Sequence, residues 1–164
     1  MPEWVDNKLT IKGPAESVER FIQRAQGHDP VYKQDRDRVQ EGKFQAFSFH
    51  ALYPVPLNVL EESYQQFGFD WELGHWGVKW GASESSLERL SPNEVVYTFD
   101  TPSGPPVLLL SNLAKEYDDL MFRLTYEGNE FTGLVKFRKG VVIKSRHRAK
   151  TEEPTTYDES RLPL

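Results

Sequence analysis

The feature that most constrains the fold of this chain is a stretch rich in glycine and tryptophan, residues 67–81. Three of the four tryptophans lie in it, Trp71, Trp76 and Trp80. Its glycines follow one another at intervals of three to six residues, which argues against one long regular element. Because ordering glycine costs the most backbone entropy, the burial of aromatic rings must stabilise such a segment. The stretch therefore predicts a compact feature that aromatic side chains anchor.

Two segments of the chain have the apolar spacing of an amphipathic helix. The first begins at Gly13-Pro14 and ends at Gly27, and the second begins at Pro105 or Pro106. A shorter helix is predicted over residues 57–66. The stripes of the two longer helices are Val18, Phe21, Ile22 and Ala25 in the first, and Pro106, Leu109, Leu110, Leu113 and Tyr117 in the second.

Alternation of apolar and polar residues predicts strands in much of the remaining chain. Residues 85–90 and 94–100 form a predicted hairpin with its turn at 91–93, and further strands are expected at 8–12, 120–127, 131–139 and 141–146. The order strand, helix, insertion, strand, strand, helix, strand is that of the split βαβ fold. The sequence thus predicts an α+β, ferredoxin-like antiparallel sheet with two packing helices. It adds a long insertion after the first helix, at about residues 28–82, and an extra C-terminal hairpin strand.

Length and composition bound the class of protein. The 164 residues predict a single domain, which we place at residues 1–150, and the polar, aperiodic residues 151–164 predict a disordered tail. The chain has no cysteine, which excludes disulfides, thiolate zinc sites and iron–sulfur clusters, so "ferredoxin-like" describes topology only. No apolar run is long enough to span a membrane and no signal pattern opens the chain. We therefore expect a cytoplasmic protein without a membrane partner.

The run His75-Trp76-Gly77-Val78-Lys79-Trp80-Gly81 resembles the HWG-x-KWG signature of the YubB-type ferredoxin-like domain family, found in phage and plasmid proteins. Residues 4–14, 47–56 and 97–102 resemble three other fixed blocks of that family, in the same order, so the resemblance covers roughly residues 1–147. Glu3 and Val5 depart from it, since Asn and Cys are expected near these positions. The resemblance implies the same fold and an origin in a mobile element of a bacterial host. It implies no activity and no catalytic residue.

The stretch at residues 67–81 supports two interpretations. Its tryptophans are either a structural cap on the sheet or, in part, a binding surface, because tryptophan is enriched at binding hot spots. Trp76 and Trp80 are four residues apart, which places them on one face of a strand and also on one face of a helix. We therefore expect both on one face, mostly buried against the sheet. The candidate binding residues are Trp71, His75, Trp76, Lys79 and Trp80.

Few groups in the sequence suggest catalysis. The chain lacks the nucleophile elbow, the P-loop and the H-E-x-x-H motif. An imidazole beside a carboxylate can act as a general acid or base, and nothing in the spacing fixes the distances between such groups here. We expect no metal site and no cofactor. The catalytic candidates are His75, His50, Asp70, Glu72 and Asp100.

A basic run near the end of the chain is the one feature typical of nucleic-acid binding. The formal net charge of −5 mildly opposes this interpretation. Tyr97 and Phe99, the aromatic candidates for stacking on bases, are equally explained by core packing. The basic residues are Lys136, Arg138, Lys139, Lys144, Arg146, Arg148 and Lys150.

Taken together, these features favour a non-enzymatic accessory protein of a mobile genetic element. It would act by binding a host or element protein, and inhibition of a host system is one form of that action. The mobile-element origin follows from the resemblance, and the non-enzymatic character follows from the missing motifs. Two alternatives stay open. One is a nucleic-acid-binding module that uses the basic C-terminal strands, and the other is a hydrolase or metal-dependent enzyme that uses His75 and nearby carboxylates.

Overall fold

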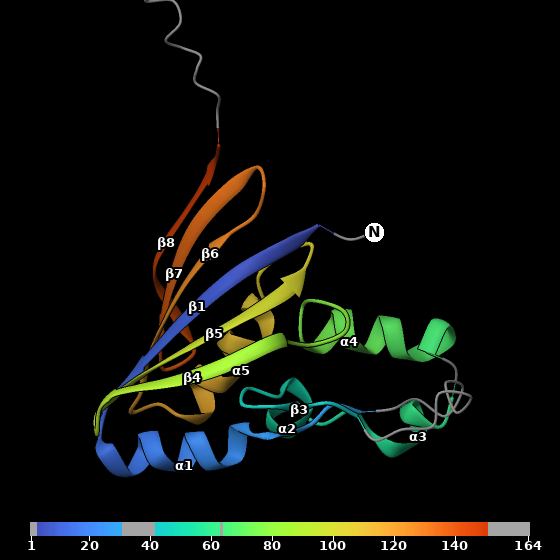
Figure 1. Cartoon of the computed structure of the whole chain (residues 1–164), viewed down its shortest axis with the longest axis horizontal. Coiled ribbons are helices and arrows are strands. Elements are labelled where there is room, and N and C mark those ends of the chain that lie inside the picture. Colours follow the sequence, from blue (N-terminus) through green and yellow to red (C-terminus); the bar gives the residue numbers. More distant parts are fainter. Residues whose placement is uncertain (1–2, 31–41, 63, 151–164) are drawn as a thin grey trace, which may run out of the picture.

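The computed structural model describes residues 3–30, 42–62 and 64–150 (Figure 1). Its main feature is a six-stranded sheet with the strand order β4-β5-β1-β6-β7-β8, in which all neighbours are antiparallel. The strands are β1 (Trp4–Lys12), β4 (Ser83–Ser91), β5 (Glu94–Pro102), β6 (Met121–Glu127), β7 (Phe131–Arg138) and β8 (Val141–Ala149). The predicted tail at residues 151–164 lies outside the described residues.

Two helices complete the predicted topology, α1 (Ala15–Ala25) after β1 and α5 (Val107–Glu116) after β5. The four strands β4-β5-β1-β6 and these helices form the split βαβ arrangement, which confirms the α+β, ferredoxin-like prediction. The predicted fold counted one extra C-terminal strand, although strands were expected at both 131–139 and 141–146, and the sheet contains both of them as β7 and β8. β7 pairs with β6, and β8 pairs with β7, because strands that are joined by a short turn usually lie next to each other in the sheet.

Strand alternation gives the sheet a covered face and an open face. In β1, Val5, Leu9 and Ile11 are fully buried, whereas Asp6 and Lys8, at the alternate positions, lie on the other side. The apolar stripes of α1 and α5 pack on the covered face, and α1 lies along that side in Figure 1. Burying each large apolar side chain contributes roughly 1.5–3 kcal/mol to stability. In the part of the chain that the structure describes, no helix covers the other face (Figure 1), and most of its side chains are polar.

The insertion between α1 and β4 packs on the covered face as well. It contains β2 (Gly27–His28), β3 (Phe44–Gln45), α2 (Phe49–Leu52), α3 (Leu57–Leu60), the π-helix η2 (Tyr64–Gly68) and α4 (Phe69–His75). Phe47 and Phe49 fix it to the sheet, since their ring centroids lie 4.8 and 6.0 Å from that of Phe99. The single helix predicted over residues 57–66 is therefore wrong, because α3 ends at Leu60 and a separate helical segment follows.

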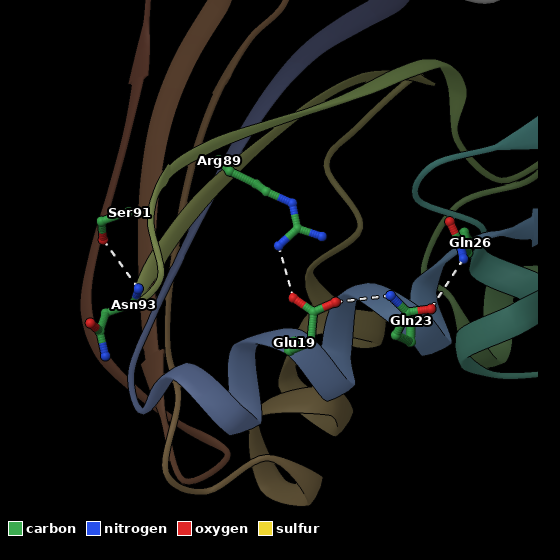
Figure 2. Close-up of polar contacts among 6 residues, drawn as sticks. All are labelled: Glu19, Gln23, Gln26, Arg89, Ser91 and Asn93. Atoms are coloured by element: carbon green, nitrogen blue, oxygen red, sulfur yellow. Dashed lines mark hydrogen bonds and ion pairs between the residues drawn. The ribbon is translucent and has the colours of Figure 1, made fainter.

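Side chains of α1 and the insertion contact β4, an edge strand of the sheet. Arg89 of β4 reaches Glu19 of α1, with 2.8 Å between Nη1 and Oε1, and Gln23 donates a second hydrogen bond to the same carboxylate (Figure 2). Gln45 of β3 accepts a hydrogen bond from the backbone N–H of Ser85 in β4, at 3.1 Å. None of the helices in the described residues has the length and apolar character needed to cross a membrane.

Candidate functional site

Trp76 is a structural residue at the centre of the insertion. Its ring is 1% exposed, and its Nε1–H donates to the backbone oxygen of Tyr53 across 3.0 Å. The ring of Phe49 meets it edge to face, with 5.5 Å between centroids. Its own carbonyl accepts from the N–H of Leu109 near the start of α5. Trp76 thus joins three elements that are far apart in the sequence, and a partner has no access to its ring in this arrangement.

Trp80 has the opposite environment, since 46% of the residue is exposed. Its backbone adopts φ = 73°, a region that residues with a side chain rarely occupy. The buried carboxylate of Glu72 accepts the Trp80 N–H at 2.8 Å and the hydroxyl of Tyr64 at 3.0 Å. The expectation that Trp76 and Trp80 share one buried face is therefore wrong. The positive φ angles at Gly77 and Trp80 interrupt the regular periods on which that expectation depended.

The exposed ring of Trp80 has a cation and further apolar side chains around it. The Nζ of Lys79 lies 4.4 Å from the centre of the Trp80 ring and 5.9 Å from that of Phe69. The ring of Trp4 lies 6.2 Å away, and Leu73 is exposed on α4 one turn from Phe69. Trp4, Phe69, Leu73, Lys79 and Trp80 are called the Trp80 surface below.

A hollow of about 260 Å³ opens beside these residues. Its wall includes Phe69 and Leu73 from α4, Lys79, and Pro102 at the end of β5. Exposed apolar side chains that gather around a hollow are typical of binding sites. The sequence interpretation missed Trp4, Phe69 and Leu73. The exposure of Trp4 could have been predicted from the sequence, because Trp4 alternates with the buried residues of β1 and so belongs to the open face.

Trp71 and His75 form a stack of their own, separate from Trp80. Their ring centroids are 4.2 Å apart with an interplanar angle of 16°, and Tyr53 meets both rings edge to face. Because a carbonyl oxygen can only accept, the Nδ1 of His75 donates to the backbone oxygen of Trp71 at 2.8 Å. Both residues are half-buried. The five candidate binding residues therefore divide into the buried Trp76, the half-buried Trp71, His75 and Lys79, and the exposed Trp80.

The five catalytic candidates lie in different surroundings. Asp70 is exposed and Glu72 is buried on α4, so the helix directs the two carboxylates into different surroundings. The Nδ1 of His50 accepts the N–H of Val55 at 3.1 Å, and burial lowers the pKa of its imidazole. Within the described ranges, no three His, Asp or Glu side chains are grouped as metal ligands.

Asp100, the fifth candidate, projects from the open face of β5, on the opposite side of the sheet from the insertion. It lies opposite Asp6 of β1, in a shallow concavity of about 480 Å³ that Glu84 and Glu127 also line. The pKa of Asp100 is raised, first by burial, then by its hydrogen bond to Asp6 and by the charges of Asp6 and Glu84. The sheet separates this acidic group from the two histidines.

The basic residues of the C-terminal run gather on the open face of the last three strands. Strand register places Arg123, Lys136 and Lys144 in one row across β6, β7 and β8, and sequence reasoning missed Arg123. Arg146 and Arg148 continue the same face of β8, Arg138 ends β7, and Lys139 stands in the turn with φ = 55°. Tyr97 and Phe99, the two aromatic candidates for base stacking, are buried on the covered face instead.

Comparison with known proteins identifies the family. A family model described as the ferredoxin-like domain in Api92-like protein matches residues 75–161, more than half of the chain. The chain belongs to this family. The crystal structure of the protein Api92 from Yersinia pseudotuberculosis is similar with a TM-score of 0.68, over 92% of this chain and 99% of that chain. At 14% sequence identity this similarity shows a shared fold. No curated protein matches the chain.

Proposed function

We propose that this protein is a non-enzymatic accessory protein of a mobile genetic element, which acts in the bacterial cytoplasm by binding a partner protein. The observation that carries the proposal is the display of Trp80. An unfavourable backbone angle and a buried carboxylate hold an aromatic ring at the surface, where it gains little from burial. Local strain of this kind tends to occur at functional positions. The mobile-element origin and the location rest on the resemblance of the motif at residues 75–81 to phage and plasmid proteins.

The chemistry of the Trp80 surface describes the partner. Tryptophan dominates the energetic centres of protein interfaces, and a flat ring beside an apolar hollow suits an inserted apolar side chain. Lys79 lies over the same ring, and its ammonium group can pair with a carboxylate of the partner. The surface therefore fits an apolar anchor with an acidic residue next to it. Inhibition of a host defence system is one form that such binding takes.

The environments of the histidines support the non-enzymatic part of the proposal. The Nδ1 of His75 is engaged by a backbone carbonyl and that of His50 by a backbone N–H. A hydrolase built on Asp100 would have to act on the other side of the sheet, without either histidine. These contacts favour binding over the alternative of a hydrolase or metal-dependent enzyme.

The test is affinity capture of partners from native host cells with three forms of the tagged full-length chain. The forms are wild type, Trp80→Ala and Leu90→Ala. Leu90 is a matched control because it is 51% exposed but lies near the Ser91–Glu94 pair, at the opposite end of the sheet from Trp4. The proposal expects a protein captured by wild type and by Leu90→Ala and lost with Trp80→Ala. Equal capture by all three forms would contradict it, as would turnover of a substrate by the purified chain.

A further inference from the structure

The two edges of the main sheet differ. The β4 edge contacts α1 through Arg89 and β3 through Ser85, and its register is irregular at two places. Among the described residues, the β8 edge pairs only with β7, and all nine residues of β8 are exposed. An open strand edge is a template on which another strand can pair.

The hydrogen-bond pattern shows which backbone groups of β8 face outward. The N–H of Lys150 donates to the oxygen of Glu130 at 2.8 Å. Because bonded and non-bonded pairs alternate in an antiparallel ladder, Arg148, Arg146 and Lys144 point their backbone groups toward β7. The N–H and C=O groups of the residues between them therefore face away from the sheet. These residues are Ser145, His147 and Ala149.

Side chains hold this edge in place before any partner arrives. The ring of His147 stacks on Phe131, with 5.3 Å between centroids, and its Nδ1 lies 2.9 Å from the hydroxyl of Tyr126. Lys150 pairs with Glu127 at the end of the strand. An edge that is already ordered loses less entropy when another strand adds to it.

The open face of β8 carries a regular row of cations. Lys144, Arg146 and Arg148 stand at alternate positions, about 6.6 Å apart along the strand. Within the described residues, none of the three has a carboxylate at ion-pair distance. Side chains of an added strand would lie about 5 Å from this row, where opposite charges stabilise cross-strand pairs. A second copy of β8, paired antiparallel over the same residues, would place Arg146 opposite Lys144, Arg146 or Arg148 of the other copy, and like charges in that position are destabilising.

We propose that β8 is a docking edge that adds an extended partner segment with acidic residues at every second position, as a further strand of the sheet. The occupant is defined by charge complementarity to the basic row and by the outward N–H and C=O groups. This surface is separate from the Trp80 surface, so the two proposals can fail independently.

The probe is a synthetic extended peptide in which glutamate alternates with threonine and valine, titrated into the full-length protein. Two N-methylated forms of the peptide supply the backbone control. One is methylated at the residues whose N–H groups would face β8, and the other at the residues between. Only the first should weaken binding, by about tenfold or more, because only it removes the cross-strand bonds. Hydrogen exchange should show new protection at the amides of Ser145, His147 and Ala149.

Charge reversals on the protein complete the test. Arg146→Glu should weaken binding of the peptide by about tenfold, whereas Arg123→Glu, the same change two strands from the edge, should have a much smaller effect. Trp80→Ala should leave the peptide affinity unchanged. Several results would overturn the proposal. These are equal binding of both methylated peptides, no peptide binding, protection of the edge amides by self-association alone, and a preference for a single-stranded oligonucleotide with steep salt dependence.

Discussion

The carboxylate of Glu72 accepts the backbone N–H of Trp80 across 2.8 Å, from a side chain that is almost fully buried. This contact links α4 to the end of the tryptophan-rich stretch and fixes the backbone that carries the exposed ring of Trp80. A buried carboxylate is costly unless hydrogen bonds satisfy it, and here Tyr64 and Trp80 both donate. From the interior of the protein, Glu72 therefore holds the backbone of Trp80 in the proposed binding surface.

Removal of the Glu72 carboxylate should destabilise the protein. Glu72→Ala leaves the donors of Tyr64 and Trp80 without their acceptor, and an unsatisfied buried donor costs about 1–3 kcal/mol. Glu72→Gln is the matched control, because its amide oxygen can still accept, so its loss should be clearly smaller. Urea denaturation of the three proteins measures the difference. A Glu72→Ala variant as stable as wild type would show that the contact does not matter for the fold.

The two tryptophans Trp76 and Trp80 should respond differently to the same substitution. Trp76→Ala empties a buried aromatic site and should cost roughly 3–5 kcal/mol in the free energy of unfolding. Trp80→Ala removes a ring that is nearly half exposed, so its cost should be below about 1 kcal/mol, and its defect should be in partner binding. Thermal melts of both variants decide this. Similar stability losses for the two would contradict the division between a structural and a displayed ring.

Asp29, at the start of the insertion, should make stability depend on pH. Burial raises the pKa of Asp29 to about 6, against the opposing effects of Gln45, Lys43 and His28. A folded-state pKa above the unfolded value means that the contribution is fully present below about pH 4 and is lost as the pH rises through about 6.

The variant Asp29→Asn keeps a neutral side chain at every pH and isolates this effect. Its melting temperature relative to wild type should increase from pH 4 to about 6 and then level off. Melting curves of both proteins in matched buffers measure the difference. A difference between the two proteins that stays constant over this range would show that Asp29 does not titrate in this way.

The fold was largely predictable, because two periodicities control it. The stripe of α1, with Phe21 and Ile22 buried, and the alternation of Leu9 and Ile11 in β1 both appear as expected. The helix α4 was not predicted, since Gly68 and Gly74 flank or interrupt its seven residues. Two local interactions favour the helix. The negative charge of Asp70 in the first turn interacts favourably with the helix dipole, and the rings of Trp71 and His75 stack one turn apart. Intrinsic helix propensities include neither interaction.

The candidate site was predicted only in part, for a physical reason. Trp80 is exposed and Lys79 is half-buried beside it, whereas their sequence spacing predicted that Trp80 would be buried on the same face as Trp76. Such spacing arguments apply only while the backbone stays regular, and φ angles of 88° at Gly77 and 73° at Trp80 interrupt the regular backbone. The function of Glu72 had no sequence signal at all. A buried carboxylate that accepts a backbone N–H eight residues away depends on the tertiary path of the loop.

The last prediction concerns the boundary of the folded domain. Removal of residues 151–164 should leave the melting temperature within a few degrees of wild type, because Lys150 already closes β8 through Glu127 and Glu130. Truncation after Lys144 is the contrasting variant. It removes His147, with its stack on Phe131 and its bond to Tyr126, and half of an edge strand. Each kcal/mol lost lowers the melting temperature by about 2–4 °C in a chain of this size, so this second truncation should be plainly destabilising. A large drop on removal of residues 151–164 alone would mean that the tail packs against the domain.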